Sequence, residues 1–147
     1  MEKRGEWLIR LSRSIIFCLI IFSGCATKEA VKNSGDEEIL RERVTAYWNH
    51  KINGEFEKSY EYESPLYRKQ VSVMRYVSGF DTPSKVKWVG TGIESVAIDG
   101  DSANVNLRVR LSINTGNPDR KIGPETFESE QWVKVEGVWY HVPQRLK

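Results

Sequence analysis

The sequence predicts an α+β domain, with helices first and an antiparallel sheet after them. Two observations support this class. Apolar residues recur at helical spacing from about residue 37 to residue 80, whereas a strand-like period of two dominates from about residue 85 to residue 143. The two patterns do not alternate along the chain, so a parallel βαβ architecture is not expected.

The helical half is expected to contain three helices. The first should run from about residue 37 to residue 51, with Asp36 as its N-cap, and a short second one from about residue 55 to residue 62. Ser64-Pro65 then opens a further helical turn, because Ser caps well and Pro fits the first helical position. Two apolar stripes define the first and third helices: Leu40, Val44, Tyr47 and Trp48 on one, and Val73, Tyr76, Val77 and Phe80 on the other.

The strand half begins near Lys85. Gly90 and Gly92 interrupt the alternation of the first strand and predict a bulge or bend there, and Asp99-Gly100 is a strong hairpin signal. The next strand is the clearest element of the chain, since one of its faces is apolar and the other polar. The apolar face consists of Ala103, Val105, Leu107, Val109, Leu111 and Ile113, and the polar face of Asn104, Asn106, Arg108, Arg110 and Ser112.

A loop over residues 114–125 leads into the last hairpin, which spans about residues 127–143 and turns at Glu136-Gly137. One of its faces carries Val133, Val135, Val138, Tyr140 and Val142. We expect the other face, with Trp132, Trp139 and His141, to be the outer one. Exposed tryptophans that lie close together usually mark a contact surface. These three residues are therefore a candidate interaction surface, compatible with a homodimer. The loop could cover them instead.

The order of elements resembles the nuclear transport factor 2-like superfamily, the cone-shaped fold of the ketosteroid isomerases, over about residues 37–143. Two local patterns carry the resemblance: one runs from Tyr47-Trp48-Asn49 to Ser64-Pro65, and the other is the closing segment from Trp132 to Tyr140. The resemblance implies a strongly curved sheet with the helices closing over it and a pocket between them. It implies no single function, because that fold hosts isomerases, dehydratases and non-catalytic binding modules.

A separate signal occupies the N-terminus. Residues 1–24 have a basic start, an apolar run over residues 15–22 and two small residues, which is the order of a secretory signal. The run is shorter than the roughly 20 apolar residues that a spanning helix needs. Residues 20–25 resemble the lipobox of bacterial lipoproteins, which implies that Cys25 is lipidated and becomes the mature N-terminus. The alternative is an ordinary signal peptide with a chance cysteine.

Removal of the signal would change the composition. The chain has 22 Lys and Arg against 20 Asp and Glu, and 18 of each remain after residue 24. A near-neutral domain does not favour nucleic acid as a partner. Cys18 would leave with the signal and Cys25 would carry the lipid, so no disulfide or cysteine metal site is expected. Residues 25–36 are polar and are expected to form a flexible tether to a single domain over residues 37–147.

Aromatic residues are concentrated in the helical half. Nine of the 13 that follow residue 24 lie between Tyr47 and Trp88. Six could line the pocket that the resemblance implies: Tyr47, Trp48, Tyr60, Tyr76, Trp88 and Tyr140. A mostly apolar pocket with a few hydroxyls suits a small apolar ligand, although the same rings could instead fill the cone as its core.

An isomerase or dehydratase of that fold would need an ionisable base in the pocket. The apolar faces named above contain none, so only Asp81, after the third helix, and His141, on the last strand, are weak candidates. His50 is expected at the end of the first helix, where a histidine favours the negative helix terminus. Two histidines without paired carboxylates make no metal motif, and no cofactor-binding motif occurs.

These observations favour a lipid-anchored protein of the bacterial cell envelope, at the outer membrane if the envelope is Gram-negative, whose domain binds a ligand or a partner protein without catalysis. One alternative is a small-molecule enzyme of the isomerase or dehydratase type that uses Asp81 or His141 as its base. Another is an accessory subunit of an envelope or secretion complex. An inward-facing base without a partner would favour the enzyme, whereas a sealed core with exposed tryptophans would favour the interaction module.

Overall fold

The structure, a computed structural model, describes residues 26–80, 86–113 and 123–144. The chain divides into two compact units, Met1–Gly35 and Asp36–Lys147. The described part of the first unit is the helical backbone of residues 26–35. The side-chain contacts below belong to the second unit, which contains the sheet and the short helices.

The first described helix, α2, spans Ala26–Ile52 and begins well before the predicted start at residue 37. The segment expected to be a flexible tether is therefore helical from Ala26 on. Its opening residues, Ala-Thr-Lys-Glu-Ala-Val-Lys, are mostly good helix formers. Asp36 is not a cap, because it lies inside the helix and its carboxylate pairs with the Lys134 ammonium at 2.5 Å.

Three short helices follow α2: α3 (Phe56–Tyr60), α4 (Pro65–Gln70) and α5 (Val73–Ser78). The Ser64 side chain caps α4 by accepting a hydrogen bond from a backbone N–H of the first turn, and Ser72 caps α5 in the same way. The predicted Ser-Pro helix start is confirmed. No helix within the described ranges has the length and apolar character needed to cross a bilayer.

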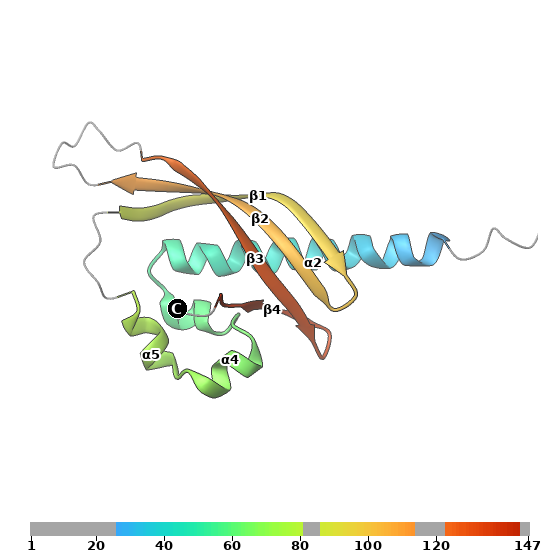
Figure 1. Cartoon of the computed structure of the whole chain (residues 1–147), viewed down its shortest axis with the longest axis horizontal. Coiled ribbons are helices and arrows are strands. Elements are labelled where there is room, and N and C mark those ends of the chain that lie inside the picture. Colours follow the sequence, from blue (N-terminus) through green and yellow to red (C-terminus); the bar gives the residue numbers. More distant parts are fainter. Residues whose placement is uncertain (1–25, 81–85, 114–122, 145–147) are drawn as a thin grey trace, which may run out of the picture. The chain divides into compact units, whose positions relative to one another are not determined.

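Four strands form one antiparallel sheet in the order β1-β2-β3-β4 (Figure 1): β1 (Val86–Asp99), β2 (Ser102–Ile113), β3 (Glu125–Val135) and β4 (Val138–Val142). The pairing of β1 with β2 shifts register between Trp88 and Gly90, which confirms the bulge expected there. The hairpin turns also fall where predicted. Gly100 and Gly137 have φ angles of 58° and 81°, which favour glycine.

Strand β2 and helix α2 form the centre of the core. Ala103, Val105, Leu107 and Val109 of β2 are at most 3% exposed, while Arg108 and Arg110 on the other face are exposed. The buried face packs against the α2 stripe of Leu40, Val44, Tyr47 and Trp48. Figure 1 shows helix α2 running along the sheet. The two-residue period of β2 therefore identified the buried face correctly.

The last hairpin faces the opposite way from the prediction. Trp132 is 1% exposed and Trp139 is fully buried, and both belong to the core. The face with Val133 and Tyr140 is only half-buried. Both faces of this hairpin carry large apolar residues, although Lys134 and His141 lie on the tryptophan face. The indole rings bury more apolar surface than the valines of the other face, so the tryptophan face is the inner one. The exposed interaction surface expected from Trp132, Trp139 and His141 is therefore not formed.

Candidate functional site

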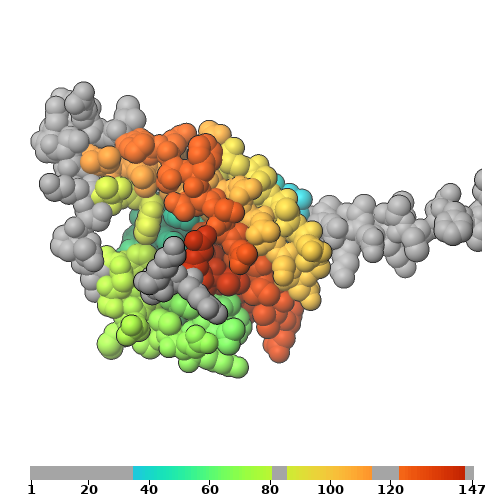
Figure 2. All heavy atoms as spheres, viewed as in Figure 1, coloured from blue at the N-terminus to red at the C-terminus, as the bar shows by residue number. Residues whose placement is uncertain are grey.

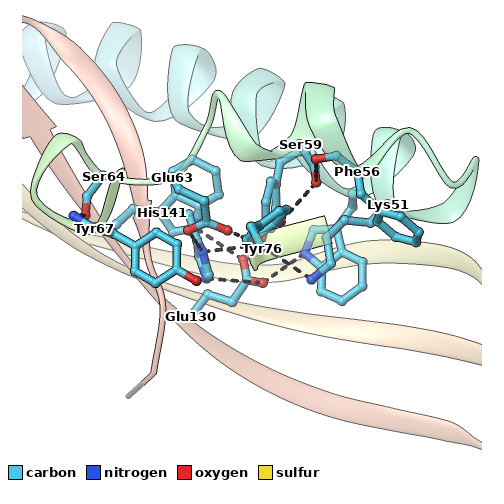
Figure 3. Close-up of polar contacts among 12 residues, drawn as sticks. Lys51, Phe56, Ser59, Glu63, Ser64, Tyr67, Tyr76, Glu130 and His141 are labelled. Atoms are coloured by element: carbon cyan, nitrogen blue, oxygen red, sulfur yellow. Dashed lines mark hydrogen bonds and ion pairs between the residues drawn. The ribbon is translucent and has the colours of Figure 1, made fainter. Parts of the chain in front are cut away.

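A group of polar side chains lies inside the second unit, between α2, the segment after α3 and the strands β3 and β4 (Figure 3). It consists of Tyr47, Lys51, Glu63, Glu130 and His141, and we call it the buried polar cluster. Glu63 is 1% exposed and Glu130 is 8% exposed. The sequence patterns placed no carboxylate at a buried position, and the two glutamates correct that expectation.

The backbone fixes the position of Glu63. It pairs with His141 in a short parallel bridge, at the edge of the sheet that β4 forms. The Ser64 N–H donates to the His141 carbonyl, and the His141 N–H donates to the Tyr62 carbonyl, both at 2.8 Å. This main-chain pairing brings Glu63 and His141 together although 78 residues separate them.

Both oxygens of the Glu63 carboxylate accept hydrogen bonds. The Tyr47 hydroxyl donates to Oε1 at 2.9 Å, and His141 Nδ1 lies 2.8 Å from Oε2. The Tyr47 and His141 rings also stack, with their centroids 4.9 Å apart. Burial, helped by the charge of Glu63, raises the pKa of Tyr47 well above its ordinary value, so its hydroxyl remains a donor.

Glu130 lies on the other side of the imidazole ring. Its two oxygens accept hydrogen bonds from the indole N–H groups of Trp48 and Trp132, at 3.1 Å and 3.2 Å. His141 Nε2 is 3.8 Å from Glu130 Oε1, too far for a hydrogen bond but close enough for electrostatic attraction when the imidazole is protonated. Burial raises the pKa of Glu130. His141 is thus held between two buried carboxyl groups.

A pocket of about 530 Å³ opens onto this cluster, and we call it the His141 pocket. Tyr47, Glu63 and His141 form its inner end, and its walls include Tyr67, Tyr76 and Phe80 with Arg75. Figure 2 shows the helical segments α4 and α5 (green) on the same face as the C-terminal strands (red). The volume of the His141 pocket lies within the range of about 300–1,000 Å³ typical of small-molecule sites.

A second pocket, of about 470 Å³, shares Gly79 and Phe80 with the His141 pocket as lining residues. We call it the Lys51 pocket. Lys51, Phe56 and Trp88 line it. Lys51 thus belongs both to this pocket and to the buried polar cluster, where its Nζ is 3.4 Å from the Tyr47 hydroxyl.

The six aromatic residues predicted to line a pocket do not all line the same one. Tyr47 and Tyr76 line the His141 pocket, while Trp88 lines the Lys51 pocket. Trp48 is buried against Trp88, with ring centroids 5.8 Å apart. The Tyr60 hydroxyl donates to the Val71 carbonyl at 2.6 Å, which joins α3 to the turn before α5.

Tyr140 is placed differently from the prediction. It lies under the guanidinium groups of Arg43 and Arg68, at 5.4 Å and 5.6 Å, and it does not line the His141 pocket. Neighbouring residues of a strand point to opposite faces, so Tyr140 points away from the side on which His141 meets Tyr47.

Of the two candidate bases and the predicted lipidation site, the structure describes only one residue. His141 lies in the cluster, whereas Asp81 and Cys25 lie outside the described residues. His50 Nδ1 pairs with Glu55 at 2.7 Å near the end of α2. No group of three or more His, Cys, Asp or Glu side chains in the described ranges could hold a metal ion.

One of the two missed glutamates had a signal in the sequence. Glu130 precedes Trp132 by two residues, so the two side chains share a face of β3, as Trp139 and His141 do on β4. Placing the tryptophans inward would have placed Glu130 and His141 inward too. Glu63 had no comparable signal, because only its pairing with β4 brings it to the site.

Comparison with solved structures supports the fold. No family model matches the chain, and no curated protein matches its sequence. A SEC-C motif-containing protein from Rhodopseudomonas palustris has a TM-score of 0.51 and 14% identity, over 69% of this chain and 73% of that one. A proposed dehydratase of the nuclear transport factor 2-like family from Streptomyces avermitilis has a TM-score of 0.50 and 13% identity, over 76% of this chain and 97% of that one. The likeness shows an α+β fold of the nuclear transport factor 2-like type, as the sequence resemblance implied.

Proposed function

We propose that this domain binds a small molecule in the His141 pocket, and that a lipid on Cys25 anchors it in the bacterial cell envelope. The main support is the buried Glu63–His141 pair at the inner end of a pocket of about 530 Å³. Tyr67, Tyr76 and Phe80 offer aromatic walls, while the pair offers polar groups at one end. A ligand with an apolar ring and one hydrogen-bonding group suits this arrangement.

The structure favours a ligand site over the protein-interaction surface that the sequence suggested. That surface depended on exposed Trp132 and Trp139, and both are in the core. Of the three residues of the predicted surface, His141 is the one that lines the pocket proposed here. We therefore propose a small molecule, rather than a protein, as the ligand of this end of the fold.

Hydrogen bonding within the cluster favours binding over catalysis. Both Glu63 oxygens and His141 Nδ1 already have protein partners, at 2.9 Å and 2.8 Å. A general base must reach the proton that it removes, within hydrogen-bonding distance. Here Glu63 orients the imidazole, and the remaining nitrogen, Nε2, faces Glu130 at 3.8 Å.

An acid–base enzyme is the second candidate, and the same Glu63–His141 contact is the observation in its favour. A carboxylate that binds one imidazole nitrogen fixes the tautomer and supports the positive charge that the ring gains as a base. The similar structure from Streptomyces avermitilis, a proposed dehydratase, agrees with this candidate. Loss of a proton from the carbon next to a carbonyl would be the simplest reaction to test.

Nitrogen NMR of the imidazole rings tests the binding proposal directly. The chain has two histidines, so a His50→Gln variant leaves His141 as the single imidazole signal. Phenol, indole and 2-cyclohexenone each join an apolar ring to one polar group. We expect at least one of them to shift the His141 signals saturably. No shift with any of the three would count against the proposed site.

A hydrogen exchange assay separates binding from catalysis. With 2-cyclohexenone in heavy water, an acid–base site would remove a proton next to the carbonyl and return a deuteron, which proton NMR detects. A non-catalytic module should bind the ketone without accelerating this exchange. Faster exchange in the unmodified protein, abolished by His141→Gln but retained by His50→Gln, would establish the enzyme candidate instead.

A further inference from the structure

Lys51 has an unusual environment for a lysine. Its Nζ lies 4.2 Å from the centre of the Trp48 ring, 4.8 Å from Tyr47 and 4.9 Å from Trp88. The Phe80 ring follows at 6.0 Å. Four aromatic faces therefore surround one ammonium group, which also lines the Lys51 pocket.

The hydrogen-bonding capacity of this ammonium is largely unused within the described part of the chain. An ammonium group has three N–H donors. The single acceptor recorded for Lys51 there is the Tyr47 hydroxyl, at 3.4 Å, and no described carboxylate lies within 4.0 Å of Nζ. Lys58 and Lys134, in contrast, pair with carboxylates at 2.7 Å and 2.5 Å.

The aromatic rings attract the cation without replacing those hydrogen bonds. Ring faces stabilise an ammonium by their quadrupoles. They offer none of the strong acceptors that a carboxylate provides, and a buried charge without such a partner is costly. Burial accordingly lowers the pKa of Lys51, although the charges of Glu130 and Glu63 oppose that change.

We propose that Lys51 binds the carboxylate of a flat apolar acid in the Lys51 pocket. The carboxylate would supply the acceptors that Nζ lacks, and the ring system would pack against Phe56, Phe80 and Trp88. The volume of about 470 Å³ admits a two-ring aromatic acid. This site is distinct from the His141 pocket, with which it shares Gly79 and Phe80 as lining residues.

Glu130 is the main electrostatic obstacle, because its charge would repel a ligand carboxylate. Its oxygens accept hydrogen bonds from the indole N–H groups of Trp48 and Trp132, whose dipoles partly offset its negative charge. Burial also raises the pKa of Glu130 and so favours its neutral form.

Calorimetry with a matched pair of probes tests the proposal. 2-Naphthoate carries the carboxylate, and 2-naphthalenemethanol has the same rings without the charge. We expect the unmodified protein to bind the naphthoate at least about tenfold more tightly, which corresponds to about 1.4 kcal/mol. Lys51→Met should abolish this preference, while Lys51→Arg should retain most of it.

Lys87→Met is the matched control, since Lys87 lines the same pocket and is exposed. It should reduce the affinity for naphthoate no more than about threefold. Thermal melts of each variant verify that the fold is intact. Equal affinities for the two probes, or a preference that survives Lys51→Met, would overturn the assignment. Failure of both probes to bind would overturn it too, while leaving the NMR test of the His141 pocket unaffected.

Discussion

The Tyr47 hydroxyl donates a hydrogen bond to Glu63 Oε1 at 2.9 Å, in a region where Tyr47 is 2% exposed and Glu63 is 1% exposed. The same hydroxyl lies 3.4 Å from Lys51 Nζ and accepts a hydrogen bond from it. Tyr47 thus contacts both Glu63, which lines the His141 pocket, and Lys51, which lines the Lys51 pocket. A single tyrosine of α2 therefore connects the Glu63–His141 pair at the sheet edge with the Lys51 ammonium.

Tyr47→Phe should destabilise the fold, because it removes a donor from a buried carboxylate. Hydrogen bonds to charged groups contribute about 1.5–3 kcal/mol, and we expect a loss in that range. Chemical denaturation measures it. Tyr140→Phe is the control: Tyr140 is half-buried and has no hydroxyl hydrogen bond in the described structure, so a change within about 0.5 kcal/mol is expected. Equal effects of the two substitutions would show that the Tyr47–Glu63 bond contributes little.

Leu107→Ala should cost about 2–5 kcal/mol, since Leu107 is fully buried at the centre of β2 and its loss leaves a cavity. The neighbouring Arg108 side chain is 45% exposed and pairs with Glu94 at 2.8 Å on the outer face. Exposed ion pairs contribute little, so Arg108→Ala should stay within about 0.5 kcal/mol. Comparable losses in denaturant melts would mean that the two faces of β2 had been assigned wrongly.

The sequence predicted the parts of the fold that depend on local pattern. Strand β2 alternates apolar and polar residues without interruption, and a period of two can bury only one face. The caps and turns follow from single residues, such as Ser64 before Pro65 or Gly137 in the last turn. None of these features requires a distant contact.

The site was harder to predict because it depends on contacts between distant segments. In the last hairpin both faces carry large apolar residues, so alternation alone cannot choose the inner one, and the choice decided where Glu130 and His141 point. Glu63 reaches the site through one parallel bridge to β4. The length of α2 was also missed, because the helix passes through Gly35 without a stop.

Cys25→Ala tests the proposed anchor. If Cys25 carries the lipid, the variant should leave the membrane fraction while its circular dichroism spectrum stays unchanged. Several acyl chains anchor a protein far more stably than one, so the release should be nearly complete. Cys18→Ala, inside the predicted signal, should leave membrane association intact. Mass spectrometry that finds an unmodified Cys25, or cleavage at another residue, would contradict the lipoprotein proposal.

Glu130→Gln should change how stability depends on pH. Burial raises the pKa of Glu130, so the folded state holds the proton more tightly than the unfolded state does. The stabilisation that this tighter proton binding gives the folded state is fully present below the pKa of an unfolded glutamate, at about pH 4. It is lost as the pH rises through the folded pKa. Relative to the unmodified protein, the variant should gain stability as the pH rises from about 4 through the folded pKa of Glu130.

Glu55→Gln provides a control of opposite sign. Hydrogen bonds from Lys58 and His50 lower the pKa of Glu55, so its contribution is present above the unfolded value and is lost as the pH falls. Relative to the unmodified protein, this variant should therefore lose stability as the pH rises, and the effect should be small because the group is exposed to screening by solvent. Urea denaturation at several pH values measures both variants. Parallel curves for Glu130→Gln and the unmodified protein would show that Glu130 is ionised as readily inside the fold as outside it.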